Sequence, residues 1–295
     1  MNNKIKISFS RRLFLWINGL VLIAISIAAL YPLLYVVFAS FSSPSALMAH
    51  QGVLLAPLKP TLLAYENVLK NPLIWSGYTN TIFVVVMGVA LNLVMTTLAA
   101  YFFSRKGIMH SKALLMVIMF TMFFSGGIIP TYLMLKNMGF LDNLLVLIIP
   151  GAINTTNMII MRTAFYSVPD SLEESARIDG AGNMTILIRI ILPLILPTFA
   201  VVGLYYAVGH WNAWFNASIY IKNKTLYPLQ LVLREILILS ETSTMDLDSS
   251  MAEQAMLSEA LKYAVIVVST VPILCVYPFI QKYFVKGVMV GAVKE

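Results

Sequence analysis

A compact group of charged and small residues stands between two apolar stretches of this chain. It runs Glu173-Glu174-Ser175-Ala176-Arg177-Ile178-Asp179-Gly180-Ala181. The chain otherwise keeps charge out of its apolar stretches, and the small residues Ser175 and Ala176 allow another protein to approach closely. The pattern therefore predicts a docking surface outside the membrane. An ordinary amphipathic connector between two spans is the alternative.

The residues around this group predict a short helix. Ser171 with Glu174 three positions later is typical of a capping box, and Asp170 is an alternative cap. The helix is expected to run to about Asp179 and to end at Gly180, where a glycine can adopt the left-handed conformation. A second helix is expected to begin near Asn183 and to continue into the next apolar segment, interrupted by Pro193 and Pro197.

A second group of chemically useful residues is His210, Trp211, Asn212 and Trp214. Aromatic rings stack on the apolar faces of sugars, and an amide both donates to and accepts from hydroxyls. These residues are candidates for a solute path. The alternative is a membrane-interface anchor, since Trp is common there, with His210 as a hydrogen-bonded structural residue.

Several catalytic patterns are missing from the sequence. There is no Gly-x4-Gly-Lys-Ser/Thr phosphate loop, no His-Glu-x-x-His and no Gly-x-Ser-x-Gly. No apolar segment contains a carboxylate, which a proton- or sodium-coupled carrier commonly uses. We therefore expect no enzyme activity and no bound cofactor in this chain, and energy supplied by a partner.

The amino-acid composition indicates the class of protein. The chain has 295 residues, 59% hydrophobic and 11% charged, whereas ordinary soluble domains carry roughly 25% charge. Lipid is therefore expected to be the main solvent. The single Cys275 and three separated histidines offer neither a disulfide framework nor a metal site. The net charge of +7 lies mostly beside apolar segments, which indicates topology and not nucleic-acid binding.

Six apolar segments approach the roughly 20 residues that a membrane-spanning helix needs. They are residues 14–37, 81–103, 113–135, 143–161, 190–215 and 263–281. The predicted fold is an all-α membrane protein with a tail at 1–13, a six-span domain at 14–281 and a tail at 282–295. Gly126-Gly127 with Pro130 predicts a kink or close packing in the third segment. The apolar stretch 226–239 is too short to span, and we expect it to be re-entrant or interfacial.

The distribution of basic residues predicts the topology. With the N-terminus in the cytoplasm, most of the 20 Lys and Arg residues fall on the cytoplasmic side, as the positive-inside rule requires. The cytoplasmic segments would include the loop 166–192 and both termini, with Lys282, Lys286 and Lys294 near the end. The long segments 38–78 and 216–262 would lie outside. The chain would be a multi-pass protein of the plasma or inner membrane.

The loop resembles the signature of the permeases of binding-protein-dependent ABC importers. Glu174 and Ala176, then Gly180, nine residues, and Ile190-Ile191-Leu192-Pro193 follow that pattern, with Ser175 where the family usually has Ala. Three further stretches are similar to the carbohydrate-uptake, maltose-transporter-type class. They are Ala176-Arg177-Ile178-Asp179-Gly180-Ala181, Phe124-Ser125-Gly126-Gly127-Ile128-Ile129-Pro130 and residues 281–294.

This resemblance implies a transport subunit for a sugar, with an oligosaccharide as the expected solute. It implies a coupling helix between spans four and five that docks on a cytoplasmic ATPase through Glu173, Glu174, Ser175, Ala176, Arg177, Asp179, Gly180 and Ala181. The implied partners are a second homologous permease, two ATPase subunits that bind ATP and Mg, and an extracytoplasmic solute-binding protein. The alternatives from the residues alone are a stand-alone channel or secondary transporter, and a membrane-embedded enzyme.

Overall fold

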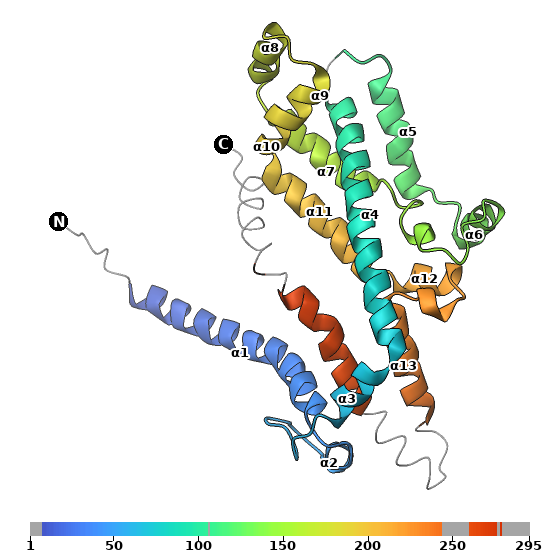
Figure 1. Ribbon diagram of the computed structural model, residues 1–295. Coiled ribbons are helices and arrows are strands. Elements are labelled where there is room, and N and C mark those ends of the chain that lie inside the picture. The colour runs from blue at the N-terminus through green and yellow to red at the C-terminus, as the bar shows by residue number, and fades with distance from the viewer. Residues whose placement is uncertain (1–7, 106, 244–259, 276–277, 279–295) are drawn as a thin grey trace. The chain divides into compact units, whose positions relative to one another are not determined.

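The computed structural model describes residues 8–105, 107–243, 260–275 and 278, and every regular element in this part of the chain is a helix (Figure 1). The chain divides into two compact units. The first comprises Met1–Lys70 with Ile236–Thr270, and the second comprises Asn71–Glu235 with Val271–Glu295. The all-helical prediction is confirmed for the described residues. The predicted tail 282–295 and the motif at 281–294 both lie outside them.

The first unit is dominated by the apolar helix α1 (Phe9–Ser40), followed by α2 (Pro44–Ala49) and α3 (Leu63–Lys70). The core of this unit is small and lies at the end of α1, where Ala39, Leu47 and Leu54 are buried and Tyr35 and Tyr263 pack against them. The rest of α1 exposes apolar side chains all round, as expected of a helix solvated by lipid or covered by another protein.

The second unit is built on α4 (Pro72–Ser104), against which α7 (Thr155–Tyr166) and α11 (Leu196–Trp211) pack (Figure 1). The buried face of α4 carries small and polar residues instead of a continuous apolar stripe. Thr81 accepts a hydrogen bond from the backbone of Leu229, and Thr96 bonds the Tyr206 hydroxyl at 2.7 Å. Such bonds hold helices together where lipid offers polar groups no partner.

Two of the predicted spans are bent pairs of helices. The segment 113–135 forms α5 (Ser111–Phe123) and α6 (Ile128–Asn137), which meet at 111°. The break includes Gly127 at φ 83°, so the predicted kink is confirmed. The segment 190–215 is bent by 88° between Leu194 and Leu196. The predicted interruption is therefore also confirmed. Neither Pro193 nor Pro197 can donate a helical hydrogen bond, which accounts for the bend.

Just before the second bend, the backbone departs from regular α-helix once more. After α9 (Asn183–Thr185), residues Ile186–Ile191 form a π-helical segment, which leads through α10 (Leu192–Leu194) into α11. Ile186, Leu187 and Ile191 are buried in the core of the unit. The wider turn therefore presents these large side chains inward just before the bend.

The segment 143–161, predicted as a span, is not one continuous helix. This segment forms a short 3₁₀ turn, η1 (Leu144–Leu147), then an irregular stretch, and only then α7. Pro150-Gly151 disfavours a helix, and the Asn154 side chain caps α7 by accepting a hydrogen bond from the Asn157 backbone at 3.1 Å. The helix cap at Asn154 and the turn at Pro150-Gly151 therefore prevent a continuous helix, although the segment is apolar in composition.

Among the described residues, α1 and α4 are long and apolar enough to cross a membrane, and up to four spans result if each bent pair counts as one. A shorter apolar helix, Ala260–Cys275, occupies part of the predicted segment 263–281, and most of the remainder of that segment lies outside the described residues. The remaining elements are α12 (Trp214–Tyr220), the 3₁₀ turn η3 (Lys224–Leu226) and α13 (Leu229–Ser243).

Candidate functional site

The charged group forms a separate short helix, α8 (Asp170–Ile178), between α7 and α9. Its start differs from the predicted capping box. Pro169 is the last extended residue, no side chain caps the helix, and Ser171 lies inside the first turn. Proline sets the backbone at this boundary, and Asp170 and Glu173 place negative charge in the first turn, where the helix dipole favours it.

The end of α8 agrees with the prediction. Gly180 has φ 82°, its N–H donates to the carbonyl of Arg177, and the N–H of Ala181 donates back to the carbonyl of Ala176. This pair of bonds is the Schellman arrangement, in which a left-handed residue closes the helix and satisfies its last carbonyls. It turns the chain sharply toward α9.

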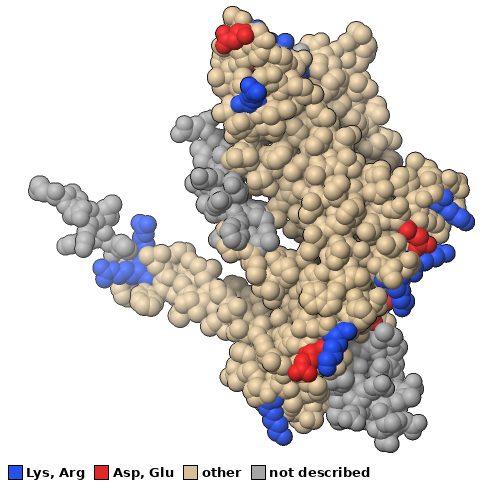
Figure 2. Space-filling model, in the orientation of Figure 1, with Lys and Arg blue, Asp and Glu red and all other residues tan. Residues whose placement is uncertain are grey.

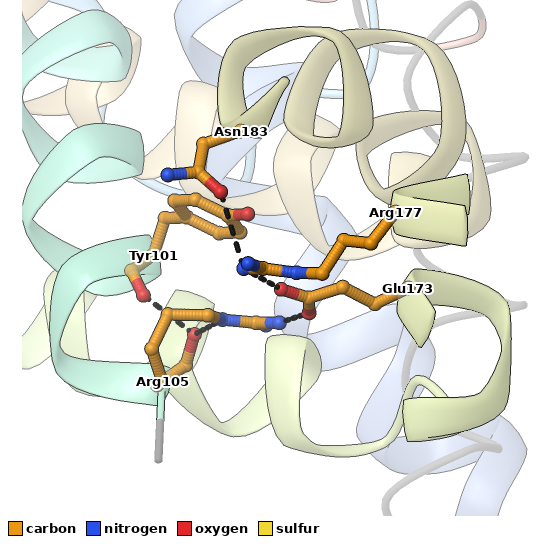
Figure 3. Close-up of polar contacts among 6 residues, drawn as sticks. Tyr101, Arg105, Glu173, Arg177 and Asn183 are labelled. Carbon is orange, nitrogen blue, oxygen red and sulfur yellow. Dashed lines mark hydrogen bonds and ion pairs between the residues drawn. The ribbon is translucent and has the colours of Figure 1, made fainter. Parts of the chain in front are cut away.

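One face of α8 is fixed to the end of α4 by a polar network (Figure 3). The Glu173 carboxylate, whose side chain is only 13% exposed, forms ion pairs with Arg105 and, at 2.9 Å, with Arg177. Arg177 also donates to the Asn183 side chain at 3.1 Å, at the start of α9. The network therefore joins α4, α8 and α9.

Arg105 is held from its other side as well. Its guanidinium lies 4.5 Å from the centre of the Tyr101 ring, one turn back on α4, in a cation–π contact. Its Nε donates to the Ser104 hydroxyl at 3.1 Å. Arg105 thus has a defined position from which to pair with Glu173.

Three further side chains of α8, those of Glu174, Ser175 and Ile178, form no ion pair with any described residue. Ala176 is buried, whereas Glu174 and Ser175 are exposed and Ile178 is 87% exposed. Figure 2 shows charged side chains at the end of the second unit where α8 lies, above a broad uncharged surface. The predicted residues thus divide into an inner set that anchors α8 and an outer set that a partner can reach.

The second predicted group is not brought together as one cluster. His210 is buried and its Nε2 lies 2.7 Å from the Asn92 side-chain oxygen on α4. The Asn212 amide donates to the Val208 carbonyl of its own helix, and the Trp214 ring lies 3.7 Å below the Arg234 guanidinium. Of the four predicted residues, His210 lines a cavity of about 510 Å³, and the other three are outside its described lining.

Comparison with known proteins decides the family. Residues 108–290 match the model of the binding-protein-dependent transport system inner membrane component. The polygalacturonan/rhamnogalacturonan transport system permease protein YtcP of Bacillus subtilis (strain 168) is 39% identical over 273 residues, covering 92% of this chain and 95% of that protein. The chain belongs to this family.

More distant relatives of the permease align over nearly all of its length. The maltodextrin transport system permease protein MalD of Streptococcus pneumoniae is 27% identical, with 100% of both chains covered. A chain in a crystal structure of a bacterial ABC transporter involved in the import of the acidic polysaccharide alginate is 34% identical. That likeness has a TM-score of 0.86 and covers 95% of the permease and 100% of the solved chain.

Membership of this family defines the role of the chain in a multi-subunit transporter. It is the inner-membrane permease subunit of an ABC importer and not an ATPase, so the transporter of which it is a component includes an ATPase and a solute-binding protein. The resemblance read from the signature loop is confirmed.

Sequence reasoning missed Arg105 as part of the permease's candidate site. The available signal was its position just after the predicted second span, on the same predicted side of the membrane as the loop 166–192. Its pairing with Glu173 could not be read from the sequence, because 68 positions of chain separate residues that only the packing of α4, α7 and α8 brings together.

Proposed function

We propose that the permease is half of a gated pathway that imports an oligosaccharide, and that α8 is the helix through which an ATPase drives it. The observation that carries the proposal is the division of α8 into two faces. Glu173 ties the inner face to Arg105, the residue that follows α4, while Glu174, Ser175 and Ile178 remain exposed. A short helix held in this way moves with whatever docks on its outer face.

The proposed site consists of an outer docking set and an inner anchoring set. Glu174 and Ser175 belong to the docking face, with Asp179 at its edge, whereas Glu173 and Arg177 hold the helix in position. Ala176, Gly180 and Ala181 fix the shape of its end. Displacement of α8 would then be transmitted to α4, the long helix on which the second unit is built.

The proposed assembly contains a second homologous permease, two cytoplasmic ATPase subunits that bind ATP and Mg, and an extracytoplasmic solute-binding protein. The permease itself would cross the membrane six times with both termini in the cytoplasm. The spans would be α1, α4, the α5–α6 pair, the segment ending in α7, the segment from α9 to α11, and the helix beginning at Ala260. The stretch that includes α13 would remain on the outer side.

The proposed cargo is a sugar chain of more than one unit. Proteins similar to this permease are named for polygalacturonan and rhamnogalacturonan transport and for maltodextrin transport, and the similar solved transporter is described as importing alginate. All of these are carbohydrate polymers or their fragments. This agreement supports an oligosaccharide over an ion or an amino acid.

The test uses the assembled transporter in lipid with its binding protein. Glu174→Lys reverses an exposed charge on α8, and Glu66→Lys makes the same change at an exposed position of α3 as the matched control. We expect Glu174→Lys to assemble normally and to lose most of the ATPase activity that sugar-loaded binding protein stimulates, with the control unaffected. Full stimulation of the Glu174→Lys transporter would overturn the role of α8, and failure of the wild-type transporter to import any oligosaccharide would overturn the cargo.

A further inference from the structure

The second unit contains a cavity of about 510 Å³ between α6, the start of α7, α11 and α12. Its described lining includes three amides, three phenols and an imidazole: Asn154, Asn157, Asn216, Tyr205, Tyr206, Tyr220 and His210. No Asp, Glu, Lys or Arg is among the described lining residues. A volume in this range is typical of small-molecule sites.

Part of the lining is locked by hydrogen bonds to the helices behind it. The Tyr206 hydroxyl bonds Thr96 at 2.7 Å and accepts the Asn154 backbone N–H at 2.9 Å. The Asn92 amide donates to the Gly151 carbonyl at 2.6 Å while its oxygen lies 2.7 Å from His210 Nε2. These bonds fix one wall of the cavity before any ligand arrives, which lowers the entropy lost on binding.

Other polar groups on the lining have no such partner. Asn157 is 7% exposed, and its side-chain amide forms no hydrogen bond with any described residue. The Tyr205 hydroxyl and the Asn216 amide are likewise unpaired within the described part of the chain. Tyr205 and Asn216 are exposed, so their polar groups are accessible to a ligand that enters the cavity.

The hydrogen-bonding properties of these unpaired side chains indicate which class of ligand the cavity can bind. Amides both donate and accept, a phenol does both through one oxygen, and an array of hydroxyls needs both functions at once. Tyr205 is 47% exposed, so its ring also offers a face to the apolar side of a sugar ring. Without a cation in its described lining, the cavity is matched to hydroxyls and not to carboxylates.

We propose that this cavity is a binding site of the permease for the hydroxyl-bearing faces of the transported sugar chain. Asn157 and Asn216 bond sugar hydroxyls, and Tyr205 packs against a sugar ring. The site reads hydroxyl geometry whether or not the sugar carries a carboxylate, and any carboxylate is bound elsewhere in the transporter. The proposal rests on the proposed oligosaccharide transport and locates part of the solute path on this chain.

The experiment measures uptake by the whole transporter in proteoliposomes, normalised to assembled complex. The probes are a neutral maltodextrin oligomer and an acidic oligogalacturonide, and each variant is tested with whichever probes the wild type imports. Asn157→Ala and Tyr205→Ala remove the free groups, Tyr205→Phe keeps the ring, and Asn67→Ala is the control, because that amide bonds its own helix at Leu63 on α3.

We expect Asn157→Ala and Tyr205→Ala to raise the KM for uptake by about threefold to tenfold, the effect of losing one or two hydrogen bonds or ring contacts. Tyr205→Phe should retain part of the affinity, and Asn67→Ala should match the wild type. Where both probes are imported, the factor should be similar for the two. ATPase activity stimulated by sugar-free binding protein should be unchanged in every variant.

Three results would count against the site. Wild-type KM in both Asn157→Ala and Tyr205→Ala would overturn it, as would an effect confined to the acidic probe. A fall in sugar-free ATPase activity that accounts for the whole loss of uptake would assign these residues to structure instead. If the wild-type transporter imports neither probe nor any other oligosaccharide, the proposed function fails first, and that outcome is distinct from the other three.

Discussion

A Cβ atom added to Gly88 on α4 would lie 2.5 Å from Nε2 of His210 on α11. The imidazole therefore occupies the notch that the missing side chain leaves, and in that position it reaches Asn92, one turn further along α4. The close approach of the two helices and the buried hydrogen bond depend on the same glycine. His210 is thus a structural contact between α4 and α11 as well as part of the cavity wall.

Gly88→Ala should destabilise the permease by about 1–3 kcal/mol, because the methyl group would overlap the imidazole within a packed interface. The thermal unfolding midpoint in detergent should fall. Gly19→Ala on α1 is the control, since nothing lies within 4 Å of a Cβ there, and alanine favours a helix. Adding His210→Ala to Gly88→Ala should remove the overlap and recover part of the loss. An unchanged midpoint for Gly88→Ala alone would contradict this packing.

The ion pair between Arg105 and Glu173 predicts non-additive effects on coupling. Arg105→Gln and Glu173→Gln should each reduce sugar-stimulated ATPase activity, and the double variant should be little worse than the more damaging single one. The two side chains are 20% and 13% exposed, so the interaction is expected to contribute about 1 kcal/mol. Lys112→Gln, at an exposed position on α5, should have no effect. Fully additive losses would show that the pair does not act as a unit.

Two neighbouring glycines allow the effect of backbone conformation to be distinguished from the effect of steric crowding. Gly180 has φ 82° and Gly182 has φ −74°, and neither would place a Cβ within 4 Å of another group. Gly180→Ala should therefore cost about 1 kcal/mol through the left-handed backbone alone, loosening the end of α8 and lowering coupled ATPase activity. Gly182→Ala should be tolerated. Equal behaviour of the two variants would mean that the Schellman closure of α8 is unimportant for coupling.

Asp142 predicts a pH dependence of stability. Its carboxylate accepts the backbone N–H groups of Lys222 and Asn223, and these bonds hold its pKa below the usual value. The stabilisation is therefore complete above the unfolded-state pKa and is lost as the pH falls through the lowered folded-state pKa. The unfolding midpoint of Asp142→Asn should lie below that of the wild type at neutral pH and approach it in acid. A difference independent of pH would rule out the charge as its cause.

The proposed topology is open to labelling. In a Cys275→Ser background, which removes the single native cysteine, a cysteine at Lys59 or Lys222 should react with an impermeant maleimide added to intact cells. A cysteine at Arg177 should react only after the membrane is broken. Reaction at Arg177 from outside would reverse the orientation and place α8 away from any cytoplasmic ATPase.

The sequence alone predicted the features that depend on local chemistry. The apolar stretches of α1 and α4 are longer than a span requires, so their helical state needs no tertiary information. Gly127 and the prolines at 193 and 197 mark bends that the structure contains, because missing donors and positive φ values act within a few residues. The spacing in the signature loop indicated the family before any comparison.

Tertiary structure decided the features that depend on contacts distant in the chain. The segment 143–161 was apolar enough to suggest a span, yet the Asn154 cap and the turn before it divide it. The sequence could not show that Glu173 pairs with Arg105 while Glu174 stays exposed, because adjacent positions on a helix differ by roughly 100° and only packing decides which one is covered. The sequence could not reveal the cavity either, because its lining also depends on tertiary packing. Asn157, Tyr205 and Asn216 come from three separate helices, and folding alone brings their unpaired polar groups to one space.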